Sequence, residues 1–196
     1  MKITRHNLFT VPVTYFKDFM PLNLANNVKE YIMEEKFKNT ASYSALIGDA
    51  ATSYNTEKNT KFIQEVVLNV AGCADLYNNI QKCINNFTSS SNLPECVLIS
   101  SWFNIQQSFS ILKRHSHISG EGVSSVSGAL YINIDEESSN ISFENPNPYG
   151  ILYKEANYTI NPSIGDLILF PSWLIHSSDK INLTKNRIVI SFNAIQ

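Results

Sequence analysis

The spacing of hydrophobic residues changes character near the middle of the chain. In the first half, apolar residues recur three or four positions apart, which is typical of amphipathic helices. This spacing predicts a helix over 22–38 and a helical stretch over 56–87, which Gly72 divides into two helices. An extended segment over 8–15 precedes them, and the polar run 88–94 is expected to be the loop that ends the helical half.

The second half consists of short apolar runs separated by Gly, Pro, Asn and Ser, which indicates β-strands joined by turns. Many short strands at close spacing are typical of a β-sandwich or barrel. We therefore expect one α+β domain over 1–196, mainly β, with a helical part at 1–94 and a β core at 95–196. The predicted strands lie at about 96–106, 108–116, 124–134, 141–144, 157–160, 166–170, 173–178 and 187–194.

Composition narrows the classes of protein to consider. With 43% hydrophobic and 16% charged residues among 196, the chain can bury a core, so wholesale disorder is excluded. The net charge of -2 argues against a general nucleic-acid or membrane-surface binder. No apolar run approaches the roughly 20 residues of a membrane span. Three cysteines without a C-x-x-C pair argue against a zinc ribbon or disulfide scaffold and favour reduced thiols in a cytoplasm.

Two histidines, His115 and His117, form an H-x-H pair in a predicted strand. Because side chains of a strand alternate between its faces, both rings are expected on the same face, where they can share a metal ion. Alone, however, such a pair is more often two partly exposed side chains than a metal site.

Two further polar residues lie in apolar strands. His176 ends the run GDLILFPSWLIHS (165–177), where it could simply be a core histidine. Arg187 opens RIVISFN (187–193), where alternation places it on one face with Ser191 while the opposite face is wholly apolar. Taken alone, Arg187 is most simply interpreted as a surface residue of an edge strand.

In combination and in this order, these motifs resemble the double-stranded β-helix, or jelly roll, of the cupin and 2-oxoglutarate/Fe(II)-dependent oxygenase superfamilies. The phrases are similar to those of small oxygenases of the phage type, and the resemblance covers about residues 95–196. It implies a double-stranded β-helix buttressed by the N-terminal helices. The phrases that carry it are SWFNI (101–105), HSH (115–117), SGALYI (127–132), FENP (143–146), GDLILFPSWLIHS (165–177) and RIVISFN (187–193).

The resemblance implies that Fe(II) is held by His115, His117 and His176. The usual triad has two histidines and one carboxylate, so His117 stands where a carboxylate is expected. Glu121, which matches a glutamate of the cupin pattern, is the alternative ligand that could replace one histidine. Three histidines with an open position also describe catalytic zinc, so the metal itself is left open.

The resemblance also implies a cosubstrate site. Arg187 matches the basic residue that pairs with the far carboxylate of 2-oxoglutarate, a task that suits a planar guanidinium. Without that anion, an arginine inside the barrel would be an unpaired buried charge, which is costly. Further hydrogen bonds to the cosubstrate are expected from Asn104, Tyr131 and Ser191.

The expected function is therefore an Fe(II)- and 2-oxoglutarate-dependent dioxygenase that hydroxylates an unidentified small molecule or peptide. Two alternatives stay open: a cupin-type metalloenzyme that does not use 2-oxoglutarate, and a non-catalytic β-sandwich binding module. We expect no membrane and no general nucleic-acid partner, and a homodimer is possible because sandwich edges often pair. The expected location is the cytoplasm, that of the host if the chain is phage-encoded.

Overall fold

The computed structural model shows three helices and ten strands among the residues it describes. Those residues are 10–39, 41–42, 51–54, 61–106, 110–118, 125–134, 140–147, 149–150, 156–178 and 186–196. The helices are α1 (Leu22–Asn39), α3 (Phe62–Asn69) and α4 (Leu76–Ser90). The strands are β1 (Thr14–Phe16), β2 (Ala41–Ser42), β3 (Ala51–Thr52), β4 (Val97–Gln106), β5 (Val126–Asn133), β6 (Ile141–Glu144), β7 (Asn157–Ile160), β8 (Leu167–Pro171), β9 (His176–Ser177) and β10 (Arg187–Ile195).

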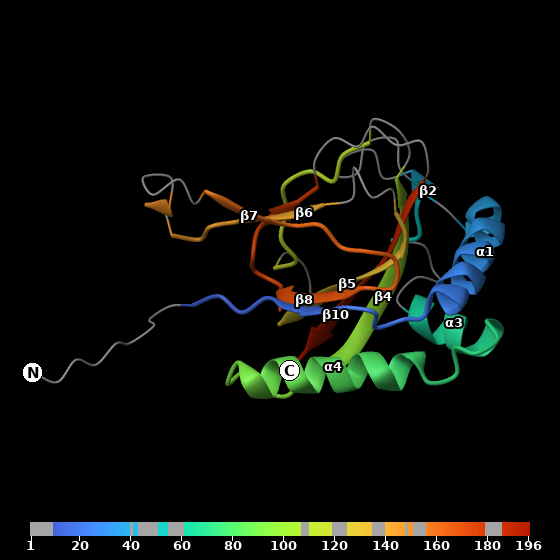
Figure 1. Cartoon of the computed structure of the whole chain (residues 1–196), viewed down its shortest axis with the longest axis horizontal. Helices are drawn as coiled ribbons and strands as arrows, with labels where there is room; N and C mark the ends of the chain where they lie inside the picture. The colour runs from blue at the N-terminus through green and yellow to red at the C-terminus, as the bar shows by residue number, and fades with distance from the viewer. Residues whose placement is uncertain are drawn as a thin grey trace, which may run out of the picture.

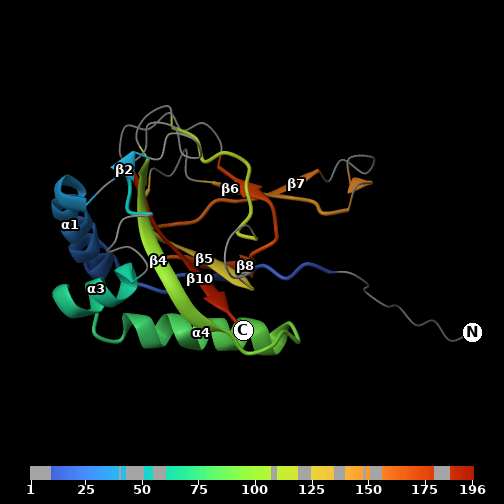
Figure 2. The same cartoon turned by 180° about the vertical axis from the view of Figure 1, so that it is seen from behind.

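The strands form two antiparallel sheets. The large sheet has the order β1-β8-β5-β10-β4-β3-β2, and the small sheet has the order β7-β6-β9. The helices α1, α3 and α4 lie on one side of the large sheet, and β6 and β7 lie on its other side (Figures 1 and 2). Among the described residues, no helix is both long and apolar enough to cross a membrane.

Each face of the large sheet covers its own hydrophobic core. On β10, Ile188, Ile190 and Phe192 are buried against the helices. Val189 points the other way, into the core between the two sheets. The alternation predicted for 187–193 is therefore confirmed, and the polar face that carries Arg187 looks between the sheets.

The helix predicted over 22–38 is confirmed by α1, and α3 and α4 confirm two helices in the described part of the stretch 56–87. The beginning of that stretch, 56–60, lies outside the described residues. Gly72 separates α3 from α4 and has a φ of 82°, a conformation that glycine adopts at little cost. The predicted loop over 88–94 was wrong for its first three residues, because α4 continues to Ser90. Thr88 is buried there and its hydroxyl donates to the Asn85 carbonyl, so the polar side chain is satisfied within the helix.

Two predicted strands need correction. The described part of 108–116 contains no strand, and its one ladder contact is an isolated bridge between His115 and His176. The strand predicted at 173–178 is reduced to β9, because the chain turns after Pro171, where the Leu174 amide donates to the Pro171 carbonyl. The extended opening is a strand only over β1, and residues 1–9 lie outside the described range.

A close contact at Gly128 of β5 gives a test of this packing. A Cβ at this position would overlap Cζ of Phe192 and would lie 2.7 Å from Cδ2 of Leu169. We therefore expect Gly128→Ala to lower the free energy of unfolding by about 1–3 kcal/mol, the usual cost of overpacking. Urea unfolding measures this, with the exposed Asn157→Ala as control. An unchanged midpoint for Gly128→Ala would contradict the packing described.

Candidate metal and cosubstrate site

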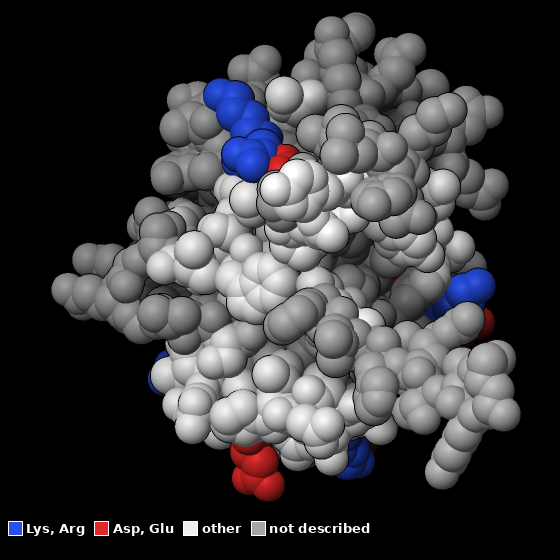
Figure 3. Space-filling model, turned by 90° about the vertical axis from the view of Figure 1, so that its left-hand side faces the viewer, with Lys and Arg blue, Asp and Glu red and all other residues white. Residues whose placement is uncertain are grey.

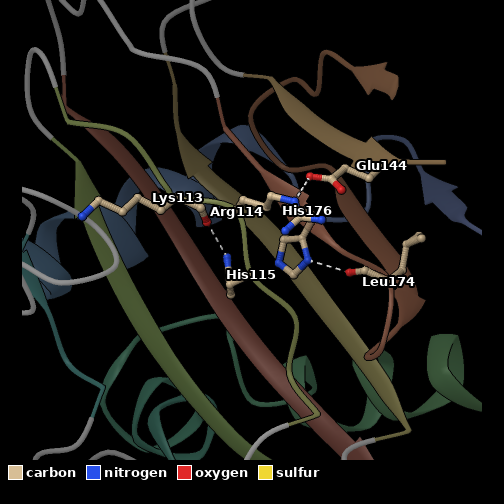
Figure 4. A network of polar contacts seen from close by, with 6 residues as sticks. All are labelled: Lys113, Arg114, His115, Glu144, Leu174 and His176. Atoms are coloured by element: carbon tan, nitrogen blue, oxygen red, sulfur yellow. Dashed lines mark hydrogen bonds and ion pairs between the residues drawn. The ribbon is translucent and has the colours of Figure 1, made fainter. Parts of the chain in front are cut away.

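Three histidines converge at the mouth between the two sheets. His176 belongs to β9, whereas His115 and His117 come from the segment 110–118, which lies beside it. One ligand nitrogen from each ring lies within 4.8 Å of the others, which confirms that the three residues are placed to bind a metal. Figure 4 shows His115 and His176 close together at this point.

The main chain, rather than a continuous strand, produces this convergence. The His115 amide donates to the His176 carbonyl over 3.0 Å, and the His176 amide donates back over 2.9 Å. The His117 amide donates to the Ser172 carbonyl over 2.8 Å. The expected same-face placement of the H-x-H pair is therefore reached by pairing with another part of the chain, and the predicted strand was not needed for it.

Each imidazole is anchored through its Nδ1 atom. Nδ1 of His115 lies 2.7 Å from the Lys113 carbonyl, and Nδ1 of His176 lies 3.0 Å from the Leu174 carbonyl. A carbonyl oxygen can only accept, so in the neutral rings both Nδ1 atoms carry the proton and both Nε2 atoms present a lone pair. A partner on the distal ring nitrogen is the usual arrangement for metal-binding histidines.

The free nitrogens fit a metal ion. Nε2 of His117 lies 3.3 Å from Nε2 of His115. Two imidazole nitrogens at about 2.1 Å from one ion and at right angles to each other would be about 3 Å apart. The residues present therefore suit a divalent ion held on one side by three imidazoles.

Burial keeps the cluster neutral. It lowers the pKa of His115 to about 4, lowers the pKa of His117, and lowers that of His176 well below the usual value, where the neighbouring imidazoles add to the effect. Neutral imidazole is the form that binds metals. The cluster that the described residues form contains no carboxylate. Glu121, the alternative ligand, lies outside the described residues.

Arg187 is buried between the sheets, and none of the carboxylates that the structure describes pairs with it. It is 4% exposed, and its Nη1 donates to Oε1 of Gln106 while Nη2 donates to the Asn140 carbonyl over 3.4 Å. Among the residues that the structure describes, its Nε has no hydrogen-bond partner and no carboxylate forms an ion pair with it. Burial lowers the pKa of Arg187. A buried guanidinium in such a setting is a site for an anion.

The other predicted cosubstrate residues lie on the same polar face. Tyr131 is fully buried beneath Arg187, whose Cζ lies 5.3 Å from the ring centroid. The Tyr131 hydroxyl has no hydrogen-bond partner within the described part of the chain. Asn104 donates from Nδ2 to Ser191 Oγ over 3.1 Å and accepts from Thr52 over 2.7 Å.

Several residues of the site were not assigned a role from the sequence. Gln106 orients Arg187, and Asn193 and Ser127 contact Nδ1 of His117. Strand alternation carries part of the signal, since Gln106 follows Asn104 by two positions and Asn193 follows Ser191 by two. Aromatic rings line the cluster: Phe170 and Phe143 lie beside His176, and Trp102 lies beside His117.

The buried histidines predict a pH dependence of stability. Because the unfolded chain takes up a proton near the ordinary pKa of 6.5 and folded His115 only near 4, the free energy of unfolding of chelator-treated protein should fall as pH drops from about 6.5 towards 4. Urea unfolding at several pH values measures this slope. His115→Gln should show a shallower slope over the same window, and an identical slope would contradict a neutral, buried His115.

Comparisons with known proteins agree with the site. Residues 100–193 match the family model described as "Putative 2OG-Fe(II) oxygenase". No curated protein sequence matches the chain significantly.

Solved structures show the same fold at low sequence identity. A Pseudomonas putida prolyl-4-hydroxylase is 11% identical with a TM-score of 0.68, over 96% of this chain and 95% of that one. The viral collagen prolyl hydroxylase of Paramecium Bursaria Chlorella virus-1, a 2OG complex, is 10% identical with a TM-score of 0.59, over 93% and 94%. HygX from Streptomyces hygroscopicus, with nickel, 2-oxoglutarate and hygromycin B bound, is 11% identical with a TM-score of 0.59, over 98% and 87%.

These likenesses confirm the double-stranded β-helix expected from the motifs. The matched segment contains the three histidines and Arg187. Two of the neighbours named above were solved with 2-oxoglutarate, and one of these two also with nickel. Residues 100–193, just under half of the chain, thus match the family of 2OG-Fe(II) oxygenases, and the chain shares the fold of these enzymes.

Proposed function

We propose that this oxygenase holds Fe(II) with His115, His117 and His176 and binds 2-oxoglutarate through Arg187, to hydroxylate a substrate that is still unidentified. The observation that carries the proposal is the pairing of two features on one inner surface. Three imidazoles with free Nε2 atoms lie at one end, and a buried guanidinium without an acidic partner among the described residues lies further along.

When bound, Fe(II) supplies the activation of dioxygen, coupled to the oxidation of 2-oxoglutarate to succinate and carbon dioxide, for insertion of oxygen into a C–H bond. The three histidines would hold this ion through their Nε2 atoms, and no described carboxylate joins them. The rings of Phe143 and Phe170 lie beside His176 and limit the access of water to the part of the cluster that His176 forms.

Arg187 and Tyr131 supply the far end of the cosubstrate site. Arg187 Nε and the Tyr131 hydroxyl are both buried and both lack a hydrogen-bond partner in the described part of the chain. Leaving buried donors unpaired is unfavourable, and a carboxylate oxygen can satisfy each of them. The Gln106 side chain holds Nη1 from the neighbouring strand, so the guanidinium is oriented before the anion arrives.

Asn104 and Ser191 lie between these two ends. β10 pairs with β4 such that Arg187 lies opposite Gln106 and Ser191 lies opposite Trp102. The Asn104–Ser191 hydrogen bond therefore sits along the path from the guanidinium to the histidines. We assign both residues to the wall of the cosubstrate site.

The fold leaves the substrate open, because solved structures of this fold hold different kinds of molecule. A prolyl hydroxylase from Trichoplax adhaerens, 12% identical with a TM-score of 0.63, is in complex with a peptide fragment, whereas HygX has hygromycin B bound. Around the β6–β7 end of the molecule, most of the described surface carries no charged side chain (Figure 3). The three cysteines are free, which supports a reducing cytoplasm, that of a host for a phage-encoded chain, as the location.

Anaerobic titration tests the cofactor assignment. Addition of Fe(II) and then 2-oxoglutarate should give a visible charge-transfer band for the wild-type chain, and succinate should form once air is admitted. His176→Ala should give neither. Metal binding by the wild type without any response to 2-oxoglutarate would instead favour a cupin-type metalloenzyme.

Substitution of the buried arginine tests the cosubstrate assignment. Arg187→Gln removes the charged fork, so the Kd for 2-oxoglutarate should rise about ten- to a hundred-fold, the cost of a lost charge-assisted contact. The affinity for the metal alone should stay unchanged. The matched control is Arg114→Gln, since Arg114 is exposed and pairs with Glu144. Equal Kd values for the two variants would contradict the role of Arg187.

A further inference from the structure

His117 is anchored differently from the other two histidines. His115 and His176 each face a main-chain carbonyl through Nδ1, and a carbonyl can only accept. His117 Nδ1 instead faces side chains, with Oδ1 of Asn193 at 2.7 Å and Oγ of Ser127 at 3.0 Å. The ligand that stands in the place of the usual carboxylate is therefore the one whose ring is held by side-chain groups.

These side chains form a connected polar cluster, which we define as Ser127, Ser172 and Asn193. Ser127 Oγ donates to Asn193 Oδ1 over 2.8 Å and lies 2.8 Å from Ser172 Oγ. Ser127 and Ser172 are fully buried, and Ser127 lies directly opposite Asn193 in the pairing of β5 with β10. The Ser172 carbonyl also accepts the His117 amide. The cluster is thus fixed by the sheet and tied to the main chain of His117.

The direction of these hydrogen bonds decides the tautomer of His117. A hydroxyl can donate or accept, so Ser127 alone would allow either ring nitrogen to carry the proton. With the Ser127 hydroxyl donating to Asn193 Oδ1, the remaining bond to that oxygen must come from the Nδ1–H group of His117. The proton then lies away from Nε2, which faces Nε2 of His115 at 3.3 Å.

We infer that Asn193 is a positioning residue of the metal site, which with Ser127 and Ser172 holds the His117 proton on Nδ1 and turns its Nε2 lone pair towards the metal. This inference rests on the proposed function, because it assumes that the three histidines bind the ion. It also gives His117 a partner that increases the basicity of its ring, where the usual site has a negatively charged ligand.

The direction of the effect distinguishes positioning from simple packing. Asn193→Leu removes the acceptor at similar size, so affinity for the metal should fall by about ten- to a hundred-fold, as for other partners of metal-binding histidines. Asn193→Asp keeps the acceptor and adds a negative charge, so affinity should be at least that of the wild type. If Asn193 had a role in packing alone, the aspartate variant would not bind the metal more tightly than the wild type. The leucine variant would then also have no reason to lose affinity for the metal while the fold stays intact.

The experiment is a titration of the full chain with Co(II) alone. Calorimetry measures the affinity, and the visible absorption spectrum reports on the surroundings of the bound ion. Asn193→Leu should bind more weakly with shifted visible bands, Ser127→Ala should change in the same direction by a smaller factor, and Asn193→Asp should bind at least as tightly as wild type. Asn157→Leu and Asn157→Asp are matched controls, because Asn157 is exposed on β7 and these changes should leave the Kd unaltered.

The outcomes separate this inference from the proposed function. If Asn193→Leu and Ser127→Ala bind Co(II) as the wild type does while His117→Ala loses binding, Asn193 has no positioning role and the metal site stands. If Asn193→Asp binds as weakly as Asn193→Leu, the inference is likewise overturned. If the wild-type chain does not bind Co(II), the inference and the proposed metal site are both wrong. Should Asn193→Leu fail to fold, Ser127→Ala and Asn193→Asp still decide the matter.

Discussion

The site depends on one pair of main-chain hydrogen bonds, those between His115 and His176. They join a segment that forms no strand among its described residues to the end of the small sheet, and they bring together residues 61 positions apart in the chain. The third ring follows because the His117 amide is bound by the Ser172 carbonyl in the turn just before β9. The metal centre is therefore a product of backbone pairing first and of side-chain chemistry second.

The large sheet contributes the remaining polar residues of the site through its strand β10. β10 separates two cores, with Ile190 and Phe192 against the helices and Val189 between the sheets. The polar residues on its inner face run from Arg187 to Asn193, so one strand contributes both the buried guanidinium and a contact to the histidine cluster. Such a strand must keep its register, because a slip of one residue would exchange its polar face for its apolar one.

The sequence was sufficient to predict those structural features whose signal lies within a short stretch of the chain. Alternation along 187–193 correctly placed Arg187 on a polar face, and the glycine at position 72 correctly divided the helical stretch. It was insufficient where partners are distant. Nothing in the sequence shows that the described part of 108–116 pairs through only one bridge, the one with His176. The contact of Asn193 with His117 likewise depends on how β10 and the 110–118 segment meet. The roles of the individual site residues are still predictions.

The two carbonyls that anchor His115 and His176 belong to residues exactly two positions before each histidine, Lys113 and Leu174. A carbonyl is present whatever the side chain is, so these two anchors survive almost any substitution at either position. Asn193 offers a side-chain oxygen instead, and few residue types can replace it. During evolution, therefore, the residues that anchor His115 and His176 are free to change type without altering the orientation of these two imidazoles. The orientation of His117, in contrast, depends on the side chain at position 193.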